Sequence, residues 1–304
     1  MKARKLILVI ADVLLLAVCI FQGVKSAKKT IKNFDISEEP DELIVQLPEM
    51  TFSIINENGS WIVGDKKYPA NQSSVQSLID TVSSVKAIDR VAKASGDEVL
   101  NRYELSEGKK VTVTVKKEGK ILRTLNIGKD SATGTQGYVC FDDNKDVYLV
   151  AANMNYLCSK TPEDLRSRAV LELDKASVIA VTVSPAEGEG WSVTAAGDGE
   201  NKSWSFSNAE LELDADKVTE WTGDLCYLAA AKWYDEAAVL HGSKLTSVAI
   251  NCGSKTEILD IFAVYNEDGT IGSYYGKCTS TPYPFEIAAY SVNKYLKNYS
   301  ELTK

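Results

Sequence analysis

The chain has a single histidine, His241, so any histidine-dependent chemistry rests on one residue. A Ser-His-Asp triad would use it as the general base, whereas an H-E-x-x-H zinc site needs two histidines and is excluded. His241 lies in Leu240-His241-Gly242-Ser243, a loop-like sequence ahead of an apolar strand pattern. We interpret it as a solvated or structural residue, with a pH switch and a ligand role as the alternatives.

Two short segments contain the residue types of phosphate or calcium sites without the required spacing. Gly276-Lys277-Cys278 is similar to the end of a phosphate loop, but no glycine stands at the required earlier position and its surroundings are strand-like. Residues 142–146 could offer oxygen ligands to calcium, but they lack the central glycine and terminal glutamate of a calcium loop, which favours a solvated turn. The sequence therefore assigns no catalytic, cofactor-binding or metal-ligating residue.

The cysteines show no metal or redox spacing. Five of them lie outside the apolar N-terminal stretch, and no C-x-x-C motif occurs among Cys140, Cys158, Cys226, Cys252 and Cys278. We expect most of them to be small buried apolar residues. One or two disulfides are the alternative if the domain is exported.

Aromatic residues remain as candidates for a binding surface. Trp61 and Trp204 occupy matching Ser-Trp pairs and are expected to anchor two hydrophobic cores. Tyr274, Tyr275 and Tyr283 could line a groove or a partner surface, and we take these three tyrosines as the candidate interaction surface. Packing into the core or ordinary exposure is the alternative interpretation.

One apolar run precedes all of these residues. It extends from Leu6 to Val24, 19 residues, which is long enough to cross a hydrocarbon core of about 30 Å as a helix. We interpret residues 6–24 as an uncleaved single-pass membrane anchor, with cleavage of a signal peptide or lipidation at Cys19 as alternatives. A short N-terminal tail usually stays in the cytoplasm, so we expect the large domain to be extracytoplasmic.

Charge separates along the chain. Residues 1–32 hold seven basic residues and one acidic residue, whereas residues 33–304 hold 27 basic and 41 acidic residues. The large part therefore has a net charge of −14, which makes it a poor candidate for binding nucleic acid or anionic lipid. The expected partners are the membrane, through the N-terminal helix, and a transporter or envelope protein.

The folded part appears twice in the sequence. Ser60-Trp61 recurs as Ser203-Trp204, 143 positions later, and a helical apolar pattern follows at the same offset. The offset then becomes 137, as between Tyr138 and Tyr275, and continues without a gap over the strand patterns. We expect a basic tail (1–5), the anchor (6–24), a polar stalk (25–42) and two repeats (43–173 and 174–304).

The expected elements follow the same order in both repeats. Alternating apolar residues predict strands, and apolar residues three and four apart predict one amphipathic helix per repeat. Predicted strands of the first repeat are 43–45, 51–55, 61–63, 111–115, 121–127, 138–141 and 147–150. Those of the second are 178–183, 191–194, 204–206, 247–251, 258–265, 272–275 and 285–287. The main helices are expected over 75–85 and 218–228, with a buried helical stretch at 225–231 and short closing helices at 165–173 and 288–297. The fold class is α+β: two tandem related subdomains of mainly antiparallel sheet plus helices, after one transmembrane helix.

Several passages along the chain form a recognisable pattern. They are the basic-apolar start, Trp61 with Tyr68-Pro69-Ala70, Arg102-Tyr103-Glu104-Leu105, the 111–128 hairpin and Leu165-Arg166-Ser167-Arg168. In these passages the chain resembles a membrane-anchored bacterial family, the domain of unknown function numbered 4340. It departs at Glu104, where the family often has glycine, and it lacks the proline expected soon after Leu105. The resemblance implies an extracytoplasmic domain on one membrane helix, with relatives linked to ABC transporters of the gliding-motility type, and it implies no site residues.

Three functions are compatible with these features. The first is a non-enzymatic accessory or protein-interaction module at the cell membrane, associated with an ABC-type transporter. The second is a solute- or polymer-binding envelope protein with a cleft between its repeats. The third is a carboxylate-dependent hydrolase, which would need two acidic groups of shifted pKa in one hollow. The anchor, the lack of a catalytic motif and the resemblance favour the first.

Overall fold

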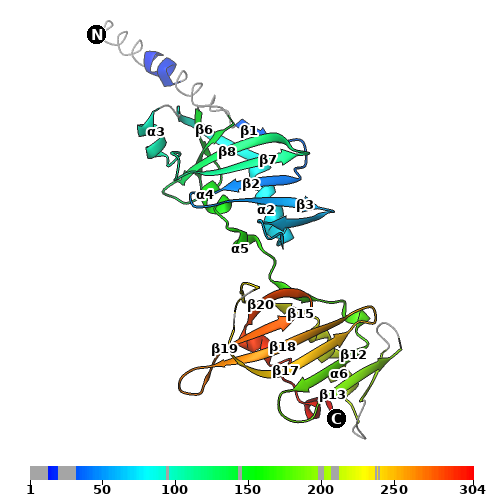
Figure 1. Ribbon diagram of the computed structural model, residues 1–304. Coiled ribbons are helices and arrows are strands. Elements are labelled where there is room, and N and C mark those ends of the chain that lie inside the picture. The colour runs from blue at the N-terminus through cyan, green and yellow to red at the C-terminus, as the bar shows by residue number, and fades with distance from the viewer. Residues whose placement is uncertain are drawn as a thin grey trace, which may run out of the picture. The chain divides into compact units, whose positions relative to one another are not determined.

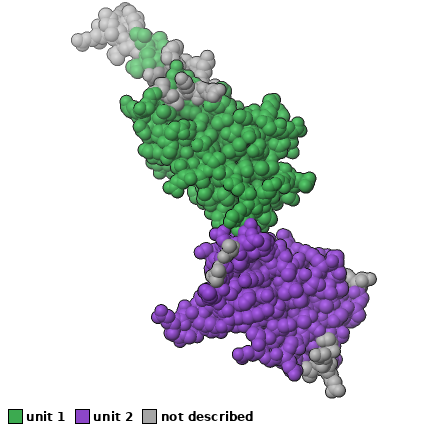
Figure 2. All heavy atoms as spheres, in the orientation of Figure 1, with its two compact units in different colours: residues 1–167 green, residues 168–304 purple. Residues whose placement is uncertain are grey.

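The computed structural model describes residues 13–19, 32–93, 96–142, 146–197, 202–206, 212–236, 238 and 240–304 (Figure 1). The chain divides into two compact units, residues 1–167 and 168–304 (Figure 2). Each unit contains a large antiparallel sheet with a few helices, so the predicted α+β class is confirmed. The division follows Ser167, six residues before the boundary expected after Leu173.

The predicted anchor falls mostly outside the described residues, and Leu6 and Val24 are among those not described. Its described portion is a helix over residues 13–19, where Val13, Leu14, Leu15, Leu16 and Val18 are exposed. Within the described residues, no helix has the length and apolar character needed to cross a membrane.

Unit 1 contains one ten-stranded sheet whose neighbouring strands are all antiparallel (Figure 1). The order across the sheet is β1-β6-β10-β9-β8-β7-β2-β3-β4-β5. Its strands are β1 (Lys32–Asp35), β2 (Glu42–Gln46), β3 (Thr51–Glu57), β4 (Ser60–Val63), β5 (Tyr68–Pro69), β6 (Ser84–Lys93), β7 (Val111–Lys117), β8 (Lys120–Asp130), β9 (Gly137–Phe141) and β10 (Asp146–Val150). Its helices are α2 (Gln72–Ser83), α3 (Asp97–Arg102), α4 (Met154–Cys158) and α5 (Pro162–Leu165).

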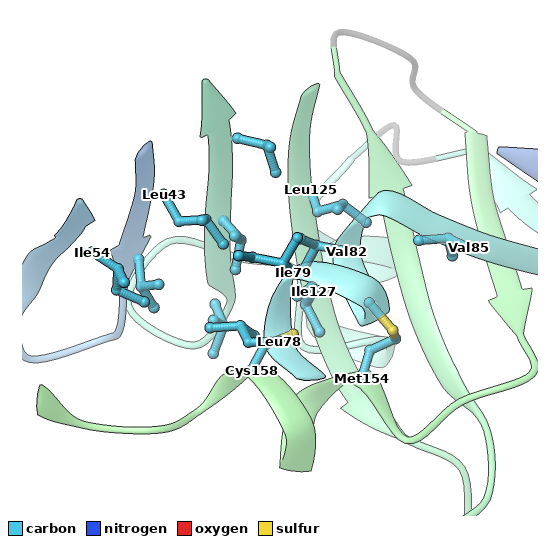
Figure 3. Close-up of a cluster of buried hydrophobic side chains, with 14 of the residues drawn as sticks. Leu43, Ile54, Leu78, Ile79, Val82, Val85, Leu125, Ile127, Met154 and Cys158 are labelled. Carbon is cyan, nitrogen blue, oxygen red and sulfur yellow. The ribbon is translucent and has the colours of Figure 1, made fainter. Parts of the chain in front are cut away.

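The core of unit 1 lies between α2 and one face of this sheet (Figure 3). Asn71 begins the helix, because its side-chain oxygen accepts from the Ser74 backbone N–H at 2.9 Å. The predicted apolar stripe is confirmed for Val75, Leu78, Ile79 and Val82, which are all buried. These side chains pack against sheet residues such as Leu43 and Ile127. Val85, expected on the helix, lies instead on β6, because α2 ends at Ser83.

A buried arginine completes this core. Arg123 on β8 is 7% exposed, and its Nη1 donates to the carbonyl oxygens of Val82 at 3.1 Å and Ser83 at 3.3 Å. The same nitrogen donates to the Phe34 carbonyl on β1 at 2.9 Å. Because the last carbonyls of a helix lack partners within the helix, a cation there is favourable. Burial lowers the pKa of Arg123, whereas Asp142 and Asp35 act to raise it.

The polar stalk predicted over residues 25–42 is wrong where the structure describes it. Residues 32–35 form β1, which pairs with β6 at the edge of the sheet. Phe34 stacks on Phe141, with 4.0 Å between ring centroids, and meets Tyr148 edge-on at 5.3 Å. Phe34 therefore attaches β1 to the sheet through its aromatic contacts. The strand was not predicted because its sequence has no alternation of apolar and polar residues.

Unit 2 contains an eight-stranded antiparallel sheet and a small two-stranded one, β11-β15. The large sheet has the order β14-β13-β12-β17-β18-β19-β20-β16. Its strands are β12 (Ala180–Pro185), β13 (Trp191–Ala196), β14 (Ser203–Phe206), β16 (Lys232–Trp233), β17 (Ser243–Asn251), β18 (Thr256–Tyr265), β19 (Ile271–Cys278) and β20 (Thr281–Ile287). The other elements are β11 (Ala169–Glu172), η1 (Lys175–Ser177), α6 (Ala215–Leu225), β15 (Tyr227–Ala229), α7 (Ala289–Val292) and η2 (Tyr299–Leu302).

The two large sheets share one strand order. In unit 1 the central eight strands run β6-β10-β9-β8-β7-β2-β3-β4, and in unit 2 the sheet runs β16-β20-β19-β18-β17-β12-β13-β14. If the eight strands of each series are numbered along the chain, strands with the same number take the same place in the two sheets. Unit 1 adds β1 and β5 at the two edges.

Each unit is completed by a closing segment that returns to the start of its main helix. In unit 1 (residues 161–167) the Asn71 N–H donates to the Leu165 carbonyl at 2.7 Å, and in unit 2 (residues 298–304) Asp214 donates to Leu302 at 2.9 Å. Both closing segments begin with a reciprocal capping box, at Thr161 and at Asn298. The closing segments therefore hold the N-terminal ends of α2 and α6 in the same way.

Three predicted helices are wrong. In place of a helix over 165–173, α5 ends at Leu165, because Arg166 is extended, 6% exposed and stacked 3.9 Å from the Tyr68 ring centroid. The stretch 225–231 contains β15, in which buried Leu228 follows exposed Tyr227 and pairs with β11. The helix predicted over 288–297 is present only as α7, and the 3-10 helix η2 begins beyond this range, at Tyr299.

Candidate functional site

A groove of about 710 Å³ in unit 2 lies between α6, η1 and β14, and we call it the α6 groove. Its volume is within the range of natural small-ligand and peptide pockets, about 300–1,000 Å³. The side chains that could contact a ligand are Asp174, Lys175, Lys202, Trp204, Thr219 and the acidic residues of α6, Asp216, Glu220 and Asp224.

The helical wall of the groove follows from the amphipathic sequence of α6. Asp214 begins the helix by accepting from the Lys217 backbone N–H at 3.2 Å, a hydrogen bond that also lowers the pKa of this carboxyl. Val218, Trp221 and Leu225 are buried against the unit 2 core. Residues four apart lie on the same face of a helix, so the remaining face presents the acidic row: Asp216, Glu220 and Asp224.

The opposite wall is held by backbone contacts. The carboxylate of Asp174 accepts from the Ala176 N–H at 3.0 Å and begins the 3-10 turn η1. The ammonium of Lys202 donates to the carbonyl oxygens of Ala176 and Val178, both at 2.5 Å. Lys202, the residue before β14, therefore connects the start of β14 to η1, and its charge faces two carbonyl dipoles.

Trp204 supplies the aromatic part of the groove. It lies on β14 opposite Ala195 of β13 and packs, partly buried, against the unit 2 core. Among the described residues its indole Nε1–H, which is buried, has no hydrogen-bond acceptor. Buried donors in proteins are nearly always paired, so this donor is an exception to that rule.

The acidic row forms no ion pair among the described residues, although Lys294 donates to the Asp224 carbonyl at 2.7 Å and its charge interacts with the Asp224 carboxylate. Asp216, Glu220 and Asp224 are exposed, and none of them forms an ion pair with a lysine or arginine that the structure describes. Unit 2 as a whole holds 20 acidic and 11 basic residues, a net charge of −9. The groove therefore presents local negative charge within a negative field.

Unit 1 has different chemistry at the corresponding helix positions. At the offset of 143, the acidic row corresponds to Ser73, Ser77 and Thr81 of α2. These hydroxyl residues line a smaller hollow of about 440 Å³, together with Leu157 and Lys160. The shared helix thus carries an anionic face in one unit and a neutral one in the other.

The predicted tyrosine surface does not form a joint patch. Tyr275 is 4% exposed, stacks on Phe262 with ring centroids 4.7 Å apart, and donates its hydroxyl to the Leu240 carbonyl at 3.2 Å. Tyr274 and Tyr283 are partly buried and pack against the unit 2 core. Adjacent residues of a strand face opposite sides of its sheet, so Tyr274 and Tyr275 diverge. Packing explains these three tyrosines.

The other sequence candidates are dispersed. His241 is exposed in the loop before β17. Asp142 accepts from the Thr124 N–H at 2.7 Å, Asp146 pairs with Arg90 at 3.3 Å, and residues 143–145 lie outside the described part. Across the described residues, no group of three or more His, Cys, Asp or Glu side chains could hold a metal ion.

The cysteines are free thiols. Cys140, Cys158, Cys226 and Cys278 are buried, as expected of small apolar residues, and Cys252 is partly exposed. Burial raises the pKa of Cys158 to about 12 and the pKa values of Cys140 and Cys226 to about 11. Because the thiolate is the reactive form, these thiols are poor nucleophiles.

Sequence analysis alone missed the α6 groove. Trp204 was expected only to anchor a core. The available signal was the spacing of Asp216, Glu220 and Asp224, four residues apart on the side of α6 opposite its apolar stripe. A comparison of the two repeats at these positions would have shown the change from hydroxyl to carboxylate.

Comparison with known proteins identifies one family. No curated protein and no solved structure matches the chain. The family described as "Domain of unknown function (DUF4340)" matches residues 61–240, which include most of the unit 1 sheet and the α6 groove. Since this match covers more than half of the sequence, the chain belongs to the DUF4340 family.

Proposed function

We propose that this protein is a non-enzymatic interaction module of the cell envelope, and that the α6 groove of unit 2 is its partner-binding site. The observation that carries the proposal is the groove itself: an exposed acidic row, without ion pairs among the described residues, and the partly buried Trp204 line one ligand-sized hollow. Charges at a protein interface face charges of the opposite sign, so a row of carboxylates fits a partner that carries cations.

The membrane part of the proposal rests on the sequence. The apolar run from Leu6 to Val24 would tether both units to a single membrane, with the large part outside the cytoplasm. A tethered module meets its partner at a high effective concentration, so a shallow groove of modest affinity is sufficient. The transporter association implied by the family resemblance belongs to this proposal, because a transporter subunit would share the same membrane.

A binding role fits the thiols and carboxylates better than catalysis does. Burial raises the pKa of the Cys158 thiol to about 12, which disfavours its thiolate at neutral pH. The carboxylates of the acidic row are exposed to water, whereas a general acid in a hydrolase is desolvated so that its pKa rises.

Purification of the full-length protein from its native membrane in mild detergent tests the proposal. We expect partner proteins to co-purify with the natural sequence and to be lost from Glu220→Lys, which reverses one charge of the acidic row. Glu267→Lys, in the exposed turn between β18 and β19, makes the same charge change away from the groove and is expected to retain them. Equal recovery of the same partners with both variants would refute a role for the groove.

A further inference from the structure

We infer that the α6 groove binds a cationic, lysine- or arginine-bearing segment of a partner polypeptide. This inference rests on the proposed function and specifies its ligand. It combines the charge of the groove, the spacing of its carboxylates and the aromatic residue beside them.

The charge of the helical wall selects a cation. Asp216, Glu220 and Asp224 line the groove from one face of α6 and form no ion pair with a described lysine or arginine, although Lys294 donates to the Asp224 carbonyl at 2.7 Å and its charge interacts with the Asp224 carboxylate. Unit 2 carries a net charge of −9, so an anionic ligand would be repelled on approach and a cationic one would be attracted. Complementary charge of this kind raises association rates and excludes partners of the wrong sign.

The spacing of the row favours a polypeptide. Residues four apart on a helix are about 6 Å apart along its axis, so the row of three spans about 12 Å. Cations at every fourth position of a partner helix have the same repeat. Alternate residues of an extended partner, about 6.6 Å apart, fit nearly as well. A short basic segment can therefore place one cation opposite each carboxylate.

The groove also contains an aromatic side chain, which attraction between opposite charges alone would not need. Trp204 lines it beside the acidic row, and the face of an indole attracts a guanidinium or ammonium group. The Nε1–H of this indole is buried in the wall, so a bound segment meets the ring and not the N–H. A lysine or arginine side chain of a peptide carries an apolar stem as well as a cation, and both parts can contact the ring.

The lysines of the groove indicate where the segment lies. Lys202 is held by two backbone carbonyls on the wall opposite α6, and Lys175 belongs to η1 on that same wall. Among the residues that line the groove, both lysines thus lie on this wall together with Asp174, whereas α6 contributes three carboxylates and no cation. The partner's cations are expected along α6, away from Lys175 and Lys202.

Fluorescence anisotropy with labelled peptides tests the inference on the full-length protein in detergent. The probe is an alanine-rich peptide with lysine at every fourth position, and its comparisons carry glutamine or glutamate instead. The groove variant combines Asp216→Asn, Glu220→Gln and Asp224→Asn. The control combines Glu187→Gln, Glu189→Gln and Glu267→Gln, three exposed carboxylates of unit 2 that form no ion pair among the described residues, and it changes the net charge equally.

We expect the lysine peptide to bind, and to bind about tenfold more weakly to the groove variant, since each exposed ion pair is worth a factor of about 1.4 to 5. The control should change affinity less than about twofold. Raising the salt from about 50 to about 300 mM should weaken binding to the natural sequence more than to the groove variant. Thermal unfolding of all three proteins confirms that each remains folded.

Several results would overturn the inference. If the groove variant and the control lose affinity for the lysine peptide equally, the peptide is attracted by the overall negative charge of unit 2 and not by the groove. Equal binding of the glutamine peptide, or stronger competition by a soluble glucosamine polymer, would mean that the ligand class is wrong. If native partners depend on Glu220 while the lysine peptide does not bind, the proposed function stands and this inference fails. If neither depends on the groove, both fail.

Discussion

Replacing Arg123 with methionine tests how the core of unit 1 is closed. The variant keeps an unbranched side chain but removes the donor that reaches Phe34, Val82 and Ser83 carbonyl oxygens. Ser83 retains a second hydrogen bond from the Ile36 N–H at 2.8 Å, so we count only the two shorter bonds. A hydrogen bond from a charged donor contributes about 1.5–3 kcal/mol. Since the two share one nitrogen, we expect the free energy of unfolding of unit 1 to fall by about 3 kcal/mol in Arg123→Met.

Urea unfolding followed by peptide-resolved hydrogen exchange measures this change. With a slope of about 2 kcal/mol per molar urea, a loss of about 3 kcal/mol moves the midpoint of unit 1 down by about 1.5 M. Peptides from unit 2 provide an internal reference, because the substituted side chain contacts only unit 1 residues. Their midpoint should not change.

Arg90→Met is the matched control for this experiment. Arg90 pairs with Asp146 at 3.3 Å, but its side chain is 58% exposed. An exposed ion pair contributes about 0–1 kcal/mol, so the midpoint should shift by less than about 0.5 M urea. Equal shifts for the two variants would refute the argument that the buried guanidinium, rather than positive charge in general, completes the core.

Three further predictions concern other positions. Glu104 has a φ of 56°, so Glu104→Gly should raise the stability of unit 1 by about 0.5–1 kcal/mol in urea unfolding, and a decrease would contradict the strain argument. Cys252 is partly exposed whereas burial raises the pKa of Cys158 to about 12. Iodoacetamide at pH 8 should therefore label Cys252 in the native protein and spare Cys158 by mass spectrometry, and equal labelling would refute the assigned burial. Desolvation alone would raise the pKa of Asp260, but hydrogen bonds from Lys244 and Ser247 lower it overall. Its stabilisation is present above the unfolded pKa and is lost as pH falls through the lower folded pKa, so Asp260→Asn should flatten the acid-induced loss of unit 2 stability below about pH 4. Identical acid profiles would contradict this.

The sequence predicted those elements whose apolar residues have a regular period. Val111, Val113 and Val115 alternate with polar residues, and all three are buried on β7. The long strand β6 was missed because its burial alternates only over the first few residues and its pairing with β10 contains two register shifts. A bulged strand does not keep a period of two, and β6 follows α2 with no intervening turn residue.

The groove was out of reach of sequence patterns for a different reason. Its walls come from three elements that are separated in the chain, and the position of Lys202 depends on hydrogen bonds to Ala176 and Val178. Periodicity shows which face of α6 is exposed, but it does not show what lies opposite that face. The burial of Tyr275 was unpredictable for a related reason, because Phe262 on a neighbouring strand and the Leu240 loop cover this side chain.

The closing segments determine the order in which the protein can be completed during synthesis. Unit 1 obtains its final contact with the start of α2 from residues 161–167, before any strand of unit 2 has been made. Its fold can therefore be complete while unit 2 is still being translated, which keeps two similar sheets from competing for each other's strands. In unit 2 the corresponding hydrogen bond, from the Asp214 N–H to the Leu302 carbonyl, comes from residues 298–304. The start of α6 can therefore make this contact only after the whole second repeat has been synthesised.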